Sequence, residues 1–254
     1  MAAFAKEHLT VNGIRTEMLV AGKGEPLMFW HGAGTIGGFD FALPWAERFR
    51  VLIPYHPGWG GSADDEGATT MQDFVLHYLD LFDQLGLDTV RLVGLSMGGW
   101  MAATFASQQS HRLKKLVLVA PAGLRVPQHP SADVFRLRPE QVPAALVHNF
   151  EVLRPFLPQP DDVDAIVQIS REQTSFARIA WERMSDPKLP RWLHRIKVPT
   201  LLLWGEGDRI IPYGQAQTWA GLIPGAQIRA FKNAGHLVLN ESAEAVSAVA
   251  AFMA

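Results

Sequence analysis

The chain has 254 residues, of which 48% are hydrophobic and 19% charged, so it holds enough apolar mass for one α/β domain with a real core. Its formal net charge of −2 predicts no basic surface for nucleic acid, and its lack of cysteine excludes disulfides and thiolate metal sites. No leader-like segment opens the chain, and no apolar run reaches the roughly 18 residues that a membrane span needs. We therefore expect a cytoplasmic protein without a membrane span.

Alternating and continuous apolar runs predict about eight strands. Residues 8–11 and 14–20 alternate and flank Asn12-Gly13, which predicts a β-hairpin with a type I′ turn. Two more runs, residues 27–30 and 116–119, are short and continuously apolar, as expected of strands buried on both faces. Further strands are predicted at residues 50–55, 90–94, 199–204 and 227–231.

Helical patterns separate most of these runs. Thr69 or Thr70 is a candidate N-cap for a helix that Gly86 ends, and a closing helix is predicted over residues 242–252. Strands that alternate with helices are typical of an α/β fold. The pattern therefore predicts a mainly parallel central sheet with helices on both faces.

The composition changes between residues 124 and 190. Nine of the 17 prolines of the chain fall in this stretch, and no strand-like run appears there. Residues 161–184 read as a helix, and a structureless loop of this length is uncommon in a compact domain. We expect 124–190 to form a helical cap, and 1–123 together with 191–254 to form the core domain.

A G-x-S-x-G motif spans Gly94 to Gly98, between a predicted strand and a predicted helix. In a nucleophile elbow the serine sits on a sharp, strained turn with its hydroxyl exposed. Side chains at Gly94 and Gly98 would collide there, and the helix behind the serine directs free N–H groups toward the site. Ser96 is therefore the candidate nucleophile; the alternative is that Ser96 only caps the helix.

A serine nucleophile needs a base within hydrogen-bond reach, and a parallel sheet gathers active-site groups at the carboxyl ends of its strands. Of the nine histidines, His31, His56 and His236 follow predicted strands. His236, in the loop between the last strand and the closing helix, is the preferred base. Asp208 and Glu206 both follow the preceding strand, and both qualify as the acid that orients it.

An oxyanion hole requires two N–H donors that are fixed before the reaction. The amide of Met97, directly after the candidate nucleophile, is the first donor. The second is expected from the loop after strand 27–30, at Ala33 or, failing that, at Gly34.

Five segments in order make the chain resemble the α/β-hydrolase fold superfamily. They are His31-Gly32-Ala33-Gly34, Pro57-Gly58-Trp59-Gly60-Gly61-Ser62, Gly94-Leu95-Ser96-Met97-Gly98-Gly99, Gly205-Glu206-Gly207-Asp208 and Gly235-His236 with Glu241 after it. The resemblance implies Asp208 rather than Glu206 as the acid, and a cap at 124–190 that shapes the pocket. It implies these remaining roles: Ser96 as nucleophile, His236 as base, Ala33 and Met97 as oxyanion donors.

The chain also departs from its relatives. His56 stands where the second segment commonly begins with aspartate. We expect it to have a structural role; the alternative is a second titratable group near the site entrance. Relatives that cleave carbon–carbon bonds in ring-fission products usually have Asn before the nucleophile and Trp after the catalytic histidine. Leu95 and Leu237 stand there. Relatives that act on epoxides or haloalkanes use an aspartate nucleophile, which Ser96 argues against.

Three other classes of protein fit the sequence less well. Residues 32–37 spell G-x-G-x-x-G, but a dinucleotide site needs a helix at the last glycine and an acid about 20 residues on, and neither is found. A binding protein of the same fold is disfavoured by the intact Ser96, Asp208 and His236. A metal hydrolase is disfavoured because no His/Asp/Glu cluster has ligand spacing such as H-E-x-x-H.

The sequence thus predicts a serine hydrolase that cleaves a small hydrophobic carboxylic ester through an acyl-enzyme, without cofactor or metal. A carbon–carbon bond hydrolase, or a catalytically weak ligand-binding relative, is the alternative. Four tryptophans lie near the motif loops or in the cap, and some of them are expected to line an apolar pocket: Trp30, Trp59, Trp100 and Trp181.

Overall fold

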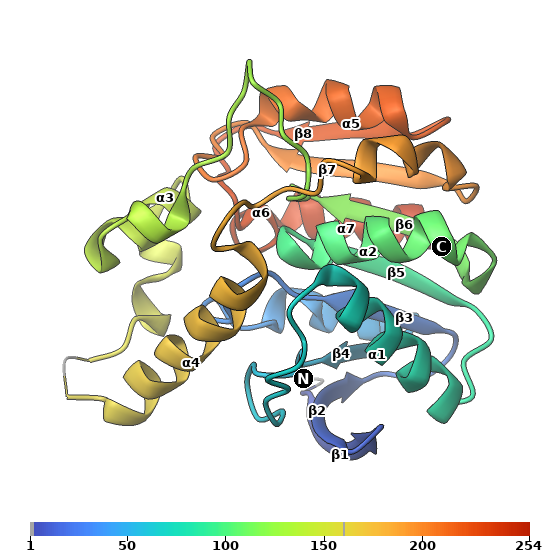
Figure 1. Cartoon of the computed structure of the whole chain (residues 1–254), viewed down its shortest axis with the longest axis horizontal. Coiled ribbons are helices and arrows are strands. Elements are labelled where there is room, and N and C mark those ends of the chain that lie inside the picture. Colours follow the sequence, from blue (N-terminus) through green and yellow to red (C-terminus); the bar gives the residue numbers. More distant parts are fainter. Residues whose placement is uncertain (1–2, 160) are drawn as a thin grey trace.

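The computed structural model describes residues 3–159 and 161–254, and a twisted sheet runs through its centre (Figure 1). The sheet of the described residues has eight strands in the order β1-β2-β4-β3-β5-β6-β7-β8. They are β1 (Ala5–Val11), β2 (Ile14–Ala21), β3 (Pro26–Trp30), β4 (Arg50–Pro54), β5 (Val90–Leu95), β6 (Leu113–Val119), β7 (Thr200–Gly205) and β8 (Gln227–Phe231). Only β1–β2 and β2–β4 pair antiparallel in that sheet, which confirms the predicted mainly parallel arrangement.

The N-terminal hairpin forms as its turn residues dictate. Asn12 and Gly13 both have positive φ, 47° and 85°, as a type I′ turn requires. The turn sets a register that pairs Val11 with Ile14, and β2 then joins the sheet beside β4.

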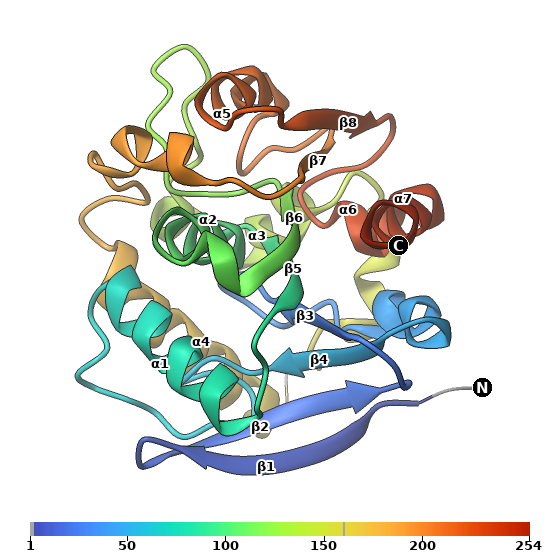
Figure 2. The ribbon, with the colours of Figure 1, turned by 90° about the vertical axis from the view of Figure 1, so that its right-hand side faces the viewer.

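Helices cover both faces of the sheet, as Figures 1 and 2 show. The elements of one face are α1 (Met71–Gln84), α2 (Met97–Gln108) and α5 (Ala216–Leu222), and those of the other are the 3-10 helix η1 (Asp40–Glu47) and α7 (Ala243–Met253). Thr70 caps α1 in a capping box with Asp73, and Gly86 follows the helix with φ 63°. Two buried clusters result, one around Trp30 and Tyr78 and the other around Trp45. None of the helices in the described part of the chain is long and apolar enough to cross a membrane.

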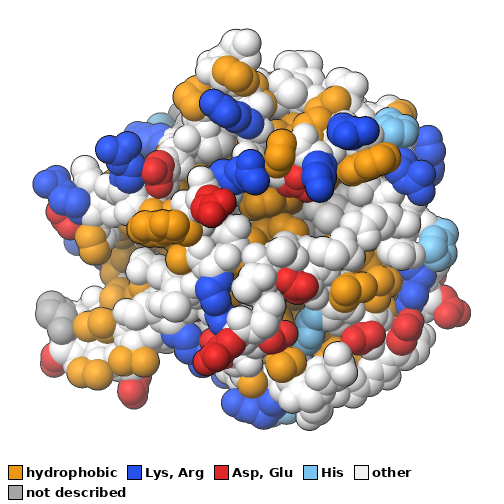
Figure 3. Space-filling view, in the orientation of Figure 1, with side chains coloured by type: hydrophobic (Ala, Val, Ile, Leu, Met, Phe, Trp, Pro, Cys, Tyr) orange, Lys and Arg blue, Asp and Glu red, His pale blue; other side chains and the backbone are white. Residues whose placement is uncertain are grey.

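We call residues 124–190 the cap segment, and its two α-helices lie beyond one end of the sheet (Figure 1). These helices are α3 (Val142–Leu146) and α4 (Val163–Ala180). Short 3-10 turns accompany them: η3 (Val134–Arg136), η4 (Pro139–Gln141), η5 (Phe150–Val152), η6 (Arg154–Phe156) and η7 (Leu189–Arg191), which ends one residue beyond the segment. Hydrophobic side chains of α4 are exposed at the outer end of the cap segment, where Figure 3 shows hydrophobic groups beside charged ones. They are Val163, Ile166 and Val167.

The helix predicted over 161–184 is shorter at its carboxyl end. Asp162 caps α4 by accepting a hydrogen bond from Ala165 N, and the helix ends at Ala180. Beyond it, Met184 O accepts from Gly123 N at 3.3 Å and Gly123 O accepts from Asp186 N at 2.9 Å. Residues 184–186 therefore pair with the loop after β6, and their backbone is not free to continue the helix.

Candidate active site

Ser96 occupies the sharp turn between β5 and α2. Its φ of 54° and ψ of −115° are a strained conformation for a residue with a side chain, which costs on the order of 1–3 kcal/mol. The packing leaves no room for side chains beside it. A Cβ on Gly98 would lie 2.2 Å from Trp30 O, and one on Gly94 would lie 2.5 Å from Gly98 O. The Ser96 side chain makes no capping hydrogen bond to α2, which removes the alternative that it serves only as an N-cap.

His236 and Asp208 are in direct contact. His236 Nδ1 lies 2.8 Å from Asp208 Oδ2, and Asp208 Oδ1 accepts from Ile210 N and Ile211 N at 2.8 and 2.9 Å. Both side chains are buried, whereas Glu206 is exposed. Because Nδ1 must carry the proton that it donates to the carboxylate, Nε2 is left as the basic nitrogen.

The cap segment contacts the loop that carries the histidine. Gly235 N donates to Glu241 Oε2 at 2.6 Å, and Glu241 Oε1 accepts from Asn149 N at 2.7 Å. Leu237 N donates to Leu146 O at 2.9 Å. The sequence motif includes Glu241, but its bond to the cap segment could not be read from spacing.

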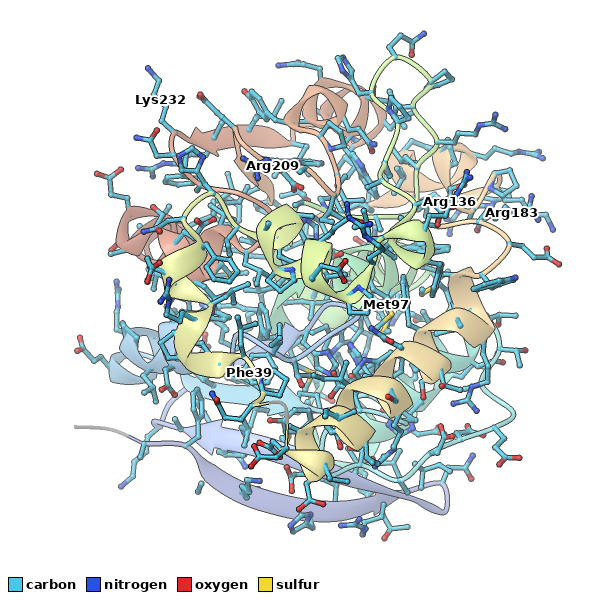
Figure 4. The ribbon with its side chains drawn as sticks, turned by 90° about the vertical axis from the view of Figure 1, so that its left-hand side faces the viewer. Phe39, Met97, Arg136, Arg183, Arg209 and Lys232 are labelled. Carbon is cyan, nitrogen blue, oxygen red and sulfur yellow. The ribbon has the colours of Figure 1, made fainter. Side chains whose placement is uncertain are left out.

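A cavity of about 310 Å³ lies where the carboxyl ends of the strands meet the cap segment. Ser96 and His236 both line it, although the hydrogen bonds of the described residues include none between them. Such catalytic contacts are often long before substrate binds. The rest of the lining is mostly apolar and comes from core and cap segment alike, for example Phe39, Phe135, Phe176 and Ile211. In Figure 4, Met97 and Phe39 are seen from the side of the cap segment.

The two candidate oxyanion donors face this cavity. Met97 is the first residue of α2, so its N–H has no partner within the helix. Ala33 also lines the cavity, and its carbonyl accepts a hydrogen bond from Trp59 Nε1 at 2.9 Å. In residues 3–159 and 161–254, no hydrogen bond occupies the amide of Ala33 or of Met97.

A buried pair of histidines supports the loop after β3. His56 Nε2 donates to His31 O at 2.9 Å and His56 N donates to His31 Nε2 at 3.1 Å, with the two rings 3.7 Å apart. His56 Nδ1 accepts from the Tyr78 hydroxyl. Burial lowers the pKa of His31 to about 4 and holds the pKa of His56 well below its usual value, so both rings are neutral at pH 7.

This arrangement agrees with the structural role expected of His56 and excludes the alternative, a titratable group at the site entrance. The side chain is fully buried beneath the loop of Ala33, not at the entrance of the site. The reason is its bond to Tyr78 on α1, which draws the ring toward the core. Of the four tryptophans, Trp100 lines the cavity, Trp30 and Trp59 are core residues, and Trp181 is exposed.

Comparison with known proteins gives the family. The family model for the α/β-hydrolase fold matches residues 25–243. A 2-hydroxy-6-oxo-6-phenylhexa-2,4-dienoate hydrolase of Burkholderia cepacia is 28% identical over 92% of this chain and 89% of its own. A carboxylesterase of Bacillus subtilis (strain 168) is 29% identical over 80% of this chain and 70% of its own.

A solved structure of another hydrolase is similar to this chain over nearly its whole length. The meta-cleavage product hydrolase from Pseudomonas fluorescens IP01 has a TM-score of 0.80 at 20% identity, covering 97% of this chain and 96% of that chain. The relatives thus include both esterases and carbon–carbon bond hydrolases. With most of its length matched by the family model, the chain belongs to the α/β-hydrolase fold family.

Proposed function

We propose that the protein is a serine hydrolase that cleaves a carboxylic ester. The main support is the 2.8 Å contact of His236 Nδ1 with Asp208. This contact leaves Nε2 of His236 free to accept a proton in the cavity that Ser96 lines. Ser96 Oγ loses its proton to His236 and attacks the ester carbonyl, while the amides of Ala33 and Met97 hold the oxyanion. His236 then protonates the leaving alcohol, and water hydrolyses the acyl-enzyme by the same route.

The charge of the cavity favours a neutral ester over the dienoate that names one relative. A dienoate carries a carboxylate, and burying a carboxylate without a cationic partner or several hydrogen-bond donors is unfavourable. No Lys or Arg is among the described residues that line the cavity, and its single Asp or Glu is Glu172. Figure 4 shows the cap-segment cations Arg136 and Arg183 apart from Met97, and neither lines the cavity. We propose that the apolar side chains of the cap segment, such as Phe135 and Phe176, contact the acyl or alcohol group.

The assignment of Ser96 is tested by covalent labelling. Wild type and Ser96→Ala are incubated with a fluorophosphonate and weighed by intact-mass spectrometry. We expect one adduct on wild type, none on Ser96→Ala, and one on Ser170→Ala, an exposed serine of α4 that serves as control. Ester turnover by Ser96→Ala should fall to near background while its melting temperature stays close to that of wild type. No adduct on folded wild type would contradict the proposal and favour a ligand-binding role.

The substrate class is tested with a matched pair of esters. p-Nitrophenyl butyrate and the p-nitrophenyl monoester of succinic acid have similar size, but only the second carries a carboxylate. Because leaving a buried charge unpaired costs about 3–5 kcal/mol, kcat/KM should be about 100-fold or more higher for the neutral ester. Equal rates for the two esters, or faster turnover of a 2-hydroxy-6-oxo-dienoate, would contradict the proposed preference for a neutral ester.

A further inference from the structure

One carboxylate of the cap segment reaches the loop that carries the proposed oxyanion donor. Glu172 lies on α4 and is only 3% exposed. Its Oε2 accepts from Thr35 N at 3.1 Å, and its Oε1 accepts from Thr35 Oγ1 at 2.8 Å. Thr35 stands shortly after Ala33 in the same loop. Both polar hydrogens of Thr35 are thereby bound to a side chain of α4.

The same carboxylate also holds a second loop. Glu172 Oε1 accepts from Gly60 N at 3.3 Å, in the loop after β4, and from Gln168 Nε2 at 2.8 Å. The ion pairs of the described residues do not include Glu172, so neutral donors alone stabilise its charge. A carboxylate has about four acceptor sites and no hydrogen to donate, which matches this donor set. A glutamine would present an NH₂ group to donors that need an acceptor.

The helix that carries Glu172 is closely packed on the loop after β4. A Cβ on Gly58 would lie 2.3 Å from Ser175 Oγ of α4, so the helix touches the bare backbone of this loop. Arg178 of α4 forms an ion pair with Asp64, just beyond the loop. These contacts fix the position of α4, and through Glu172 they fix the position of the Thr35 backbone.

We infer that Glu172 is a positioning residue that holds the loop after β3, which carries Ala33, in place. Docking of α4 on the core then completes the oxyanion hole. The inference rests on the proposed function, because it assumes that the Ala33 amide receives the oxyanion. The loop has glycines on either side of Ala33, and a Cβ on Gly34 would meet nothing within 4 Å. A misplacement of about 1 Å in a catalytic group can cost about 100-fold in rate. Glu172 therefore acts on the reaction through Thr35 and the loop.

The first test compares Glu172→Gln with wild type and with Glu182→Gln, an exposed position in the same segment. The assays are kcat and KM for p-nitrophenyl butyrate, the rate of fluorophosphonate labelling, and the melting temperature. In Glu172→Gln we expect kcat and the labelling rate to fall about 10- to 100-fold, with KM changed less than about threefold. Glu182→Gln should match wild type.

The second variant is Thr35→Val, which keeps the side-chain shape but removes the Oγ1 donor. It should lower kcat by a smaller factor than Glu172→Gln, and the double variant should lose less than the product of the two factors because both disturb one contact. If Glu172→Gln does not fold, Thr35→Val alone tests the inference: its kcat should fall while its KM changes little.

Two outcomes would overturn the inference. One is an unchanged kcat in the folded variants, and the other is an effect confined to KM, which would make Glu172 a substrate contact. Failure of the proposed function would look different. It would appear as full turnover by Ser96→Ala, whereas failure of this inference alone leaves Ser96→Ala inactive.

Discussion

Replacing His31 by glutamine should make the fold less sensitive to mild acid. The His31 ring is fully buried, donates from Nδ1 to Gly32 O at 2.7 Å and accepts at Nε2 from His56 N at 3.1 Å. Glutamine also offers one donor and one acceptor group, so it can serve the same partners. Unlike histidine, it cannot become charged, so the variant isolates the titration of this ring.

The direction follows from the lowered pKa. Burial takes the pKa of His31 from 6.5 to about 4, so between these values the unfolded chain binds a proton that the folded chain does not. The free energy of unfolding therefore falls as the pH drops through about 6.5, and this loss stops below about pH 4. From about pH 7.5 to about pH 5.5 the contribution of His31 is a loss of about 1.3 kcal/mol. Burial also lowers the pKa of His56, so this residue adds to the loss of stability in acid in wild type and in His31→Gln alike.

Urea denaturation at the two pH values, followed by tryptophan fluorescence, measures the effect. Wild type should lose about 1.3 kcal/mol more than His31→Gln between about pH 7.5 and about pH 5.5, because the other groups titrate in both proteins. His111→Gln, at an exposed histidine, should keep the pH dependence of wild type. The same pH dependence in His31→Gln and wild type would show that His31 is not held neutral by burial, and the reasoning would fail.

Two further substitutions, each paired with a control substitution, test the site directly. Asp208→Asn should lower kcat for p-nitrophenyl butyrate by about 10³- to 10⁴-fold because it favours the wrong tautomer of the histidine. Glu206→Gln, at the exposed neighbour, should change kcat little, and equal effects in both would refute the choice of acid. Gly98→Ala should lower the free energy of unfolding by about 1–3 kcal/mol, because its Cβ would lie 2.2 Å from Trp30 O. Gly221→Ala, on α5 with nothing within 4 Å of the new Cβ, should not destabilise, and thermal unfolding compares the two.

Much of the fold was predictable because its signals are local. The hairpin follows from Asn12-Gly13, whose positive φ angles match the twist of the flanking strands. The short apolar runs of β3, β5 and β7 form central strands of the parallel sheet because they are buried on both faces. The elbow follows from Gly94 and Gly98, where the packing leaves no space for a Cβ.

Other features depend on contacts between distant segments and could not be read from spacing. Glu172 binds Thr35, 137 residues away, and nothing in the pattern of α4 distinguishes it from a solvated glutamate. The burial of His56 requires Tyr78 on α1. The early end of α4 depends on the pairing of residues 184–186 with Gly123.

The loop after β3 shows why such distant contacts recur at this site. An oxyanion hole needs backbone N–H groups at fixed positions, and glycine lets the backbone approach the substrate closely but leaves the loop flexible. Besides His31, whose ring bonds Gly32 O within the loop, side chains outside the loop hold it in place. His56 holds the carbonyl of His31, Trp59 holds the carbonyl of Ala33, and Glu172 holds the amide of Thr35. These side chains come from the loop after β4 and from α4, and each fixes one backbone group of the loop after β3. Loss of any one should therefore lower kcat while leaving most of the free energy of unfolding in place.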